Sequence, residues 1–249
     1  MVFNPEIITN KENSDILPSA NVDIFYMRHG KPEGKYAHDD MPYDEFHKAL
    51  DRSSSMNIKL DEKSKEIIIK SLNESGIENQ DIKLILVSPY LRAQETAQLA
   101  QAFLAEKRGG DVDLHTTDLL REIDFDPDII SEEEYNSLLP KIGFWGIMKK
   151  IEEKWMSQDV GKHENAVESY QRAKKLLKYL RRIRKWTKHD KLLLVSHGWF
   201  GRVIQHAAQN GTPEDFFKHT DFIKEASMYG MNHDLNNDEF LLLNLNQNE

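Results

Sequence analysis

Short apolar runs alternate along the chain with longer segments in which apolar residues recur every three or four positions. The runs, such as Leu192–Val195, have the length of buried strands, and the longer segments have the period of amphipathic helices. Strands are expected over 22–27, 82–87, 112–115, 192–195, 226–233 and 240–245. Helices are expected over 43–50, 60–75, 89–107, 131–158, 164–186, 199–209 and 213–222.

Strands that alternate with helices indicate an α/β fold built on a mainly parallel sheet. A chain of 249 residues is long enough for one large domain, and no repeat or linker-like segment divides it. We therefore expect a single domain over 1–249, in which residues 1–20 form an irregular lead-in.

Three of the expected strands end in a polar cluster. These clusters are Arg28-His29-Gly30, Ser88-Pro89 and Ser196-His197-Gly198. The carboxyl ends of parallel strands share one edge of a sheet, where ligand sites of open α/β sheets form. We therefore expect Arg28, His29, Arg92 and His197 to converge on an anion, because Arg and His are costly to hold at the edge of a core without one.

Two of these clusters are also expected to begin helices. Ser88 suits an N-cap and Pro89 the first helical position, which puts Arg92 in the first turn, beside free backbone N–H groups. Ser196 is cap-like in the same way, and His197 follows it.

The composition narrows the class of protein. A formal net charge of −9 argues against a nucleic-acid partner, because an acidic body repels phosphate backbones. The chain has no cysteine, which excludes disulfides and thiolate metal sites. We find no signal peptide, no apolar stretch of bilayer-spanning length and no histidine spacing typical of a metal site. A cytoplasmic enzyme without membrane contact is expected, and nothing indicates an oligomeric state.

Four ordered blocks resemble the histidine phosphatase (phosphoglycerate mutase-like) superfamily, branch 1, over residues 22–210. The blocks are Arg28–Gly30, Ser88–Ala97 with Arg92, Leu120–Phe125, and Ser196–Gly198. One Arg-His-Gly alone would be a weak signal, but four blocks in the right order and spacing are specific. The resemblance implies a three-layer α/β/α sandwich, phosphohistidine chemistry and no metal or other cofactor.

The resemblance also implies a role for each residue. His29 would attack phosphorus through a neutral ring nitrogen while a carbonyl holds the other N–H. Arg28 and Arg92 would bind phosphoryl oxygens, and His197 would donate to the same oxygens. Glu122 would protonate the leaving alkoxide and then serve as base for water.

Each of these residues also has a purely structural interpretation. Arg28 and His29 can simply end a strand, and His197 can begin a helix without a ligand. Arg92 can form a surface ion pair with Glu95. Glu122 can be a solvated acid in the acidic loop 118–128, where Asp124 and Asp126 lie close to it in sequence.

The loop after Gly30 departs from the family pattern. Pro32 and Lys35 stand where many members carry a small hydroxyl residue and an asparagine that help bind phosphate. Pro32 has no N–H to donate, and Lys35 is at most a substitute point charge. The arginine pair and proline-rich stretch that mutases use are also missing, which favours hydrolysis over transfer.

Two helices carry further expectations. The segment 135–156, within a helical cap insertion of about 126–160, is expected either to cover the pocket and select the leaving group or to be an ordinary helix packed on the core. The helix over 171–191 is expected to present a basic outer face that includes Arg172. That face is either solvated or binds an anionic partner.

The favoured function is a metal-independent phosphatase that hydrolyses a small phosphomonoester through phospho-His29 and releases inorganic phosphate. A mutase-like phosphotransferase is one alternative. A phosphate- or phosphoprotein-binding module that has lost turnover, suggested by the altered 31–35 loop, is the other.

Overall fold

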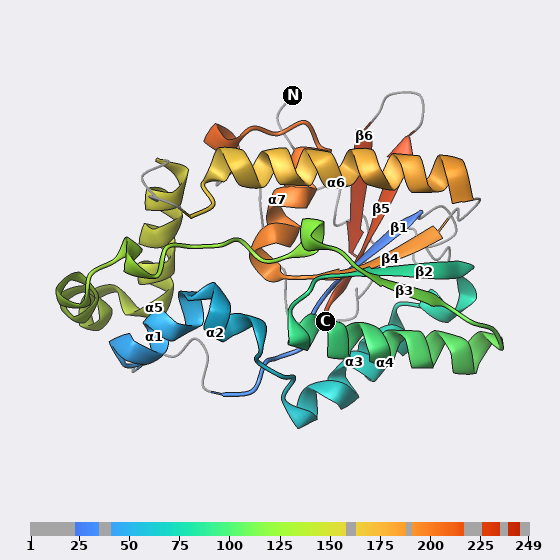
Figure 1. Cartoon of the computed structure of the whole chain (residues 1–249), viewed down its shortest axis with the longest axis horizontal. Helices are drawn as coiled ribbons and strands as arrows, with labels where there is room; N and C mark the ends of the chain where they lie inside the picture. Colours follow the sequence, from blue (N-terminus) through green and yellow to red (C-terminus); the bar gives the residue numbers. More distant parts are fainter. Residues whose placement is uncertain are drawn as a thin grey trace, which may run out of the picture.

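A six-stranded sheet forms the centre of the protein (Figure 1). The computed structural model describes residues 23–34, 41–157, 163–187, 191–216, 226–234 and 239–244. The strands are β1 (Ile24–Arg28), β2 (Ile82–Val87), β3 (Asp113–Thr116), β4 (Lys191–Ser196), β5 (Met228–Asp234) and β6 (Glu239–Asn244). Their order across the sheet is β3-β2-β4-β1-β5-β6.

The first four strands run parallel, and their carboxyl ends are level with one another. Arg28 at the end of β1 pairs with Ser196 at the end of β4, and Val87 of β2 pairs with Val195 of β4. β5 runs antiparallel to β1, and β6 runs antiparallel to β5. The chain therefore leaves β1, β2 and β4 at one edge of the sheet, as the sequence predicts.

Helices cover both faces of the sheet, so the expected three-layer α/β/α sandwich is confirmed (Figure 1). In this view α3 (Glu62–Glu74) and α4 (Leu91–Arg108) lie below the sheet. On the other side lie α6 (Ala166–Thr187) and α7 (Gly198–Ala208). Each layer buries a separate apolar cluster against the sheet.

Neighbouring residues of one strand contribute to opposite clusters, because side chains alternate between the faces of a sheet. Phe25 packs in the cluster that holds Ile68 of α3 and Leu104 of α4. Ile24 packs in the cluster that holds Leu180 of α6. This two-sided burial explains why the parallel strands are apolar throughout rather than alternating.

Three helices lie beyond the end of the sheet, at the left of Figure 1. They are α1 (Tyr43–Leu50), α2 (Arg52–Met56) and α5 (Glu132–Met156). α5 bends at Gly143, whose φ of 65° and ψ of 176° are not helical. A positive φ favours glycine, which lets the helix change direction there.

Short 3₁₀ helices complete the described structure: Ile77–Asn79, Asp118–Leu120, Pro127–Ile129 and Pro213–Asp215. The expected helix over 60–75 runs from 62 to 74, and α2 forms in a segment expected to be a loop. The predicted lead-in 1–20, Lys35, residues 158–160 of the predicted cap and 217–222 lie outside the described residues. No helix in the described ranges combines the length and apolarity that a membrane span requires.

Candidate active site

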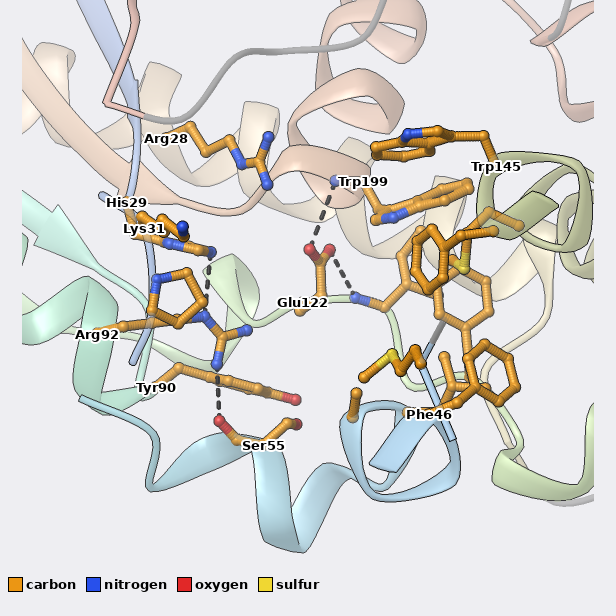
Figure 2. A pocket seen from close by; sticks show the side chains of 18 residues that line it. Arg28, His29, Lys31, Phe46, Ser55, Tyr90, Arg92, Glu122, Trp145 and Trp199 are labelled. Carbon is orange, nitrogen blue, oxygen red and sulfur yellow. Dashed lines mark hydrogen bonds between the residues drawn. The ribbon is translucent and has the colours of Figure 1, made fainter. Parts of the chain in front are cut away.

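Four of the predicted site residues, Arg28, His29, Arg92 and Glu122, lie together at the carboxyl edge of the sheet (Figure 2). Arg28, His29, Arg92 and Glu122 line one cavity of about 460 Å³. His197 lies directly behind His29, with the two ring centroids 4.9 Å apart. Topology thus gathers residues that are up to 169 positions apart (28 to 197) in the sequence.

The neighbours of His29 define its tautomer. Nδ1 lies 2.6 Å from the carbonyl oxygen of Gly30, which can only accept, so Nδ1 carries the proton. Nε2 lies 3.0 Å from Nε of Arg92, which can only donate, so Nε2 carries the lone pair. The imidazole is therefore neutral and presents an unshared electron pair beside the Arg92 guanidinium.

Burial keeps His29 in this neutral form. The ring is almost fully enclosed, and burial together with the charges of Arg92 and Arg28 lowers the pKa of His29 well below its usual value. The chain is closely packed directly after His29, since a Cβ at Gly30 would lie 2.8 Å from Cδ1 of Ile68. A side chain at this position would force the end of Ile68 on α3 to shift.

Arg92 connects three parts of the site through its planar guanidinium. Nε donates to His29, Nη1 donates to the carbonyl oxygen of Ser55 at 2.7 Å, and Nη2 lies 3.4 Å from Nδ1 of His197. The ring of Tyr90 lies 4.8 Å below the guanidinium carbon. Glu95 instead accepts from the backbone N–H of Leu60, and Arg92 is buried rather than on the surface.

Arg28 reaches the same cavity from the end of β1. Its guanidinium lies against Gly198, the first residue of α7. A Cβ at Gly198 would be only 3.0 Å from Nε of Arg28. The glycine of Ser196-His197-Gly198 therefore has a steric role: it allows the cation to approach the start of the helix.

His197 is fully buried, and its ring nitrogens contact Arg92 and Ser88. Nδ1 faces the Arg92 donor, so Nε2 carries the proton and donates to Oγ of Ser88 at 2.7 Å. Burial, with the Arg92 charge, lowers the pKa of His197 well below its usual value. Donation to a phosphoryl oxygen from Nδ1 requires the proton to change nitrogen, which the Ser88 hydroxyl permits because it can donate as well as accept.

Glu122 is held at the first turn of α7 (Figure 2). Its Oε1 accepts from the backbone N–H of Phe200 at 2.9 Å and of Ile123 at 3.0 Å, and Oε2 lies 3.4 Å from that of Trp199. Burial raises the pKa of Glu122, and the backbone hydrogen bonds only partly oppose this. A carboxyl whose proton is retained to higher pH suits a general acid.

A buried ion cluster holds the loop that carries Glu122. Arg172 of α6 binds Glu164 through two nitrogens, at 2.7 and 2.8 Å, and Arg121 binds the same carboxylate at 2.6 Å. Arg172 also donates to the carbonyl oxygen of Arg121 at 2.7 Å. The backbone on one side of Glu122 is thereby fixed to α6.

Several sequence predictions need correction. Ser88 and Ser196 are not N-caps: α4 begins at Leu91 after Tyr90, and α7 begins at Gly198 after His197. Ser88 contacts the His197 ring, and Ser196 donates to the carbonyl oxygen of Leu120. Arg172 does not belong to the exposed basic face of α6, because its pairing with Glu164 buries it.

The remaining candidates have different positions. Asp124 and Asp126 each lie 3.7 Å from a ring nitrogen of His163 and do not line the cavity. Lys35 lies outside the described residues, whereas Lys31 and Pro32 line the cavity. In the described part of the chain, no three His, Cys, Asp or Glu side chains are grouped so that they could hold a metal.

Sequence reasoning missed the contributions of Ser55, Ser88 and Tyr90 to the site. Ser55 acts through its carbonyl oxygen, which leaves no signature in the residue type. Tyr90 packs edge-on against His197, with centroids 4.7 Å apart. Its place directly after the Ser88-Pro89 cluster is the one feature of the sequence that points to it.

The cavity wall away from His29 is apolar and largely aromatic (Figure 2). It is formed by α1, α5, the loop after Glu122 and the start of α7, and includes Phe46, Phe125, Phe144, Trp145, Met148 and Trp199. α5 therefore both borders the cavity and packs on the core. Its central part lines the cavity, and Trp155 near its end is fully buried in the core.

Comparison with known proteins agrees with this geometry. A sequence profile described as "Histidine phosphatase superfamily (branch 1)" matches residues 24–246. The chain belongs to this family. The match spans β1 to the end of the sheet and includes all five site residues, as the sequence blocks predict. A search of curated proteins gave no match at the significance required.

Solved structures of histidine phosphatase type share the fold at low sequence identity. A mycobacterial glucosyl-3-phosphoglycerate phosphatase is 14% identical with a TM-score of 0.59, over 91% of this chain and 99% of that one. An alpha-ribazole phosphatase from Shigella flexneri is 16% identical with a TM-score of 0.55, over 90% and 96% of the two chains. At these identities the likeness establishes the fold alone.

Proposed function

We propose that this protein is a phosphatase that hydrolyses phosphomonoesters through a phosphohistidine formed on Nε2 of His29. The observation that carries the proposal is the tautomer of His29. Its proton is held on Nδ1 by Gly30, and its lone pair on Nε2 lies beside a permanently charged guanidinium in a cavity. A neutral imidazole with that orientation is a nucleophile placed next to a binding group for anionic oxygens.

In the first step, the lone pair on Nε2 forms an N–P bond as the ester P–O bond breaks. Arg92 exchanges its contact with Nε2 for a phosphoryl oxygen, and Arg28 binds the same group. Glu122 gives its proton to the leaving oxygen, so the alcohol departs neutral.

In the second step, water attacks phosphorus on the side that the alcohol has left. The Glu122 carboxylate takes one proton from the water, and the N–P electron pair returns to Nε2. Inorganic phosphate leaves, and Glu122 is protonated again. The structure of the mycobacterial relative in complex with inorganic phosphate supports a phosphate site in this fold.

The lining of the cavity favours hydrolysis over a mutase reaction. The cations among the described lining residues are Arg28, Lys31 and Arg92, and all belong to the His29 end. A mutase that holds a carboxylated sugar phosphate needs further cationic groups toward the distal end. The described distal wall is apolar instead.

The test is phosphate release from p-nitrophenyl phosphate, with and without EDTA. We expect His29→Ala to abolish turnover while the circular dichroism spectrum is unchanged, and His115→Ala, at an exposed position on β3, to match the wild type. Wild-type turnover is expected to be unaffected by EDTA.

Trapping identifies the intermediate. Rapid quenching with a labelled ester is expected to give an acid-labile phosphoryl group on His29, located by mass spectrometry. Turnover that persists in His29→Ala would refute the mechanism. Activity only with an added bisphosphate would indicate a mutase, and phosphate binding without turnover would indicate a binding module.

A further inference from the structure

The distal wall of the cavity is assembled from aromatic rings that already pack on one another. The rings of Phe125 and Trp199 pack edge to face with their centroids 5.2 Å apart. The rings of Phe144 and Trp145 do so with centroids 5.5 Å apart. The ring centroids of Phe46 on α1 and Phe144 on α5 lie 6.4 Å apart, so these two helices of the wall pack on each other. Rings held in this way form a preorganised apolar surface rather than one that must assemble on binding.

The cavity is larger than the phosphate-binding end requires. Its volume of about 460 Å³ lies within the range of pockets that enclose small organic ligands, about 300–1,000 Å³. The polar groups Arg28, His29, Arg92 and Glu122 occupy one end (Figure 2). The remaining volume is therefore available to the group esterified to the phosphate.

The side chains at the distal end disfavour a sugar or another polyol. A hydroxyl that leaves water without enough new hydrogen-bond partners costs free energy, and among the described distal side chains only the indole N–H groups of Trp145 and Trp199 can form hydrogen bonds. An apolar ring gains free energy from the same transfer and can pack edge to face on the wall.

Trp145 adds a second observation. Its side chain is 57% exposed, although it is one of the largest apolar groups and lies on α5 at the cavity lining. Because Trp145 borders the cavity and is largely exposed, its indole is available for contact with a ligand there. Its neighbour Phe144 is buried, and the two rings pack edge to face.

We propose that the preferred substrates are phosphomonoesters of apolar alcohols that carry an aromatic ring. This assignment rests on the proposed function, since it concerns the leaving group in the same cavity. The phosphate is bound by Arg28 and Arg92, and the ring is held among Phe46, Trp145 and Trp199.

The experiment compares esters whose alcohols have similar acidity, so that differences report binding rather than leaving-group chemistry. The esters are 2-phenylethyl phosphate, hexyl phosphate, glycerol 3-phosphate and glucose 6-phosphate. We expect kcat/KM for 2-phenylethyl phosphate to exceed that for either polyol ester by at least about tenfold, as burial of one ring implies. Hexyl phosphate is expected to fall between them.

A variant tests whether Trp145 causes the preference for an aromatic alcohol. Trp145→Ala is expected to lower the ratio of kcat/KM between 2-phenylethyl phosphate and glycerol 3-phosphate by about threefold or more, through loss of the ring contact. Tyr179→Ala removes an aromatic side chain of 40% exposure on α6, away from the cavity, and is expected to leave the ratio unchanged.

A binding measurement that needs no turnover gives a second readout. Phenylphosphonate and methylphosphonate both carry a P–C bond that the mechanism cannot hydrolyse. Phenylphosphonate is expected to bind more tightly to the wild type, and the difference is expected to shrink in Trp145→Ala.

The outcomes separate the two proposals. No phosphate release from any ester, including p-nitrophenyl phosphate, would refute the proposed function. Turnover with equal or higher kcat/KM for the polyol esters would leave that function standing and overturn the substrate class. Hexyl phosphate at least as good as 2-phenylethyl phosphate would overturn the assignment to ring-bearing alcohols.

Discussion

His29 and His197 both follow a strand, yet their neighbours place the proton on different ring nitrogens. A carbonyl oxygen faces Nδ1 of His29, whereas an arginine donor faces Nδ1 of His197. The first ring therefore presents its lone pair at Nε2, as the proposed nucleophile requires, and the second accepts from Arg92 at Nδ1. Residue type alone does not distinguish these roles, because both tautomers of imidazole are common.

Glu122 offers the sharpest test at the scale of one residue. Glu122→Gln removes the transferable proton, so we expect kcat/KM for an alkyl phosphate to fall by about 10²–10⁴-fold. An activated ester such as p-nitrophenyl phosphate needs little protonation and is expected to lose far less in its first step. Single-turnover kinetics with both esters measure this difference.

The pH profile of kcat/KM gives an independent check on Glu122. Since burial raises the pKa of Glu122, the acid form persists to higher pH than in water and is lost as pH rises through that pKa. We expect the alkaline limb of the alkyl phosphate profile to disappear in Glu122→Gln. Asp126→Asn, a nearby carboxylate outside the cavity, is the control and is expected to retain that limb.

At the scale of secondary-structure elements, two helices hold Glu122 in place. The first turn of α7 supplies the backbone N–H groups that bind the carboxylate of Glu122. α6 supplies Arg172, which clamps Glu164 and the carbonyl oxygen of Arg121 and also lies 3.5 Å over the ring of Phe200. Arg172 is therefore a positioning residue for Glu122 as well as a member of the core.

Arg172→Met is expected to destabilise the protein by about 3–5 kcal/mol, because it leaves a buried carboxylate without its main partner. Urea unfolding at pH 7 measures this loss, and Lys175→Met, at an exposed position on the same helix, is expected to have little effect. Turnover of alkyl phosphates is expected to fall more than turnover of p-nitrophenyl phosphate. Equal losses for both esters would indicate a purely structural role.

The same cluster predicts how stability changes with acid. Burial opposes ionisation of Glu164, but hydrogen bonds from Arg172 and the charges of Arg172 and Arg121 outweigh it, so the pKa of Glu164 is lowered. A lowered carboxyl pKa contributes stability that is complete above the unfolded value of about 4.3 and is lost as pH falls through the folded value. The wild type is expected to lose this contribution in acid, and Arg172→Met is expected to show a smaller loss.

At the scale of the whole molecule, an acidic chain of net charge −9 places a cationic cavity at the edge of its sheet. The charges of the two guanidiniums that line it, those of Arg92 and Arg28, both act on the buried imidazoles of His29 and His197. An anion that binds there neutralises their mutual repulsion, and it binds only when the three layers are assembled.

Inorganic phosphate is therefore expected to raise the melting temperature. At a concentration of 100 times its Kd, binding stabilises the native state by about 2.7 kcal/mol. For a chain of this size that corresponds to a rise of about 5–10 °C, measured by differential scanning calorimetry. Sodium chloride at the same ionic strength is the control, and an equal rise with chloride would contradict specific binding.

The alternation of apolar runs and amphipathic segments predicted the order of the strands and of the longer helices, though not α2, because these signals are local in the chain. The same holds for the convergence of Arg28, His29, Arg92 and His197. Parallel strands put these residues at one edge of the sheet, whereas the order β2-β4-β1, which makes them neighbours, is a tertiary feature. The prediction that Arg172 lies on the exposed basic face of α6 was wrong, because its burial beside Glu164 depends on a distant loop.

By itself, then, the pattern of the sequence determined an α/β fold with a mainly parallel sheet and the identity of the cationic and imidazole groups at its strand ends, because period and strand-end position depend on neighbouring residues; the three-layer arrangement came from the family resemblance. Tertiary structure alone decided the tautomers of the two histidines, the raised pKa of Glu122 and the aromatic character of the distal wall. Each of these depends on contacts between residues far apart in the chain, and on which groups are removed from water together.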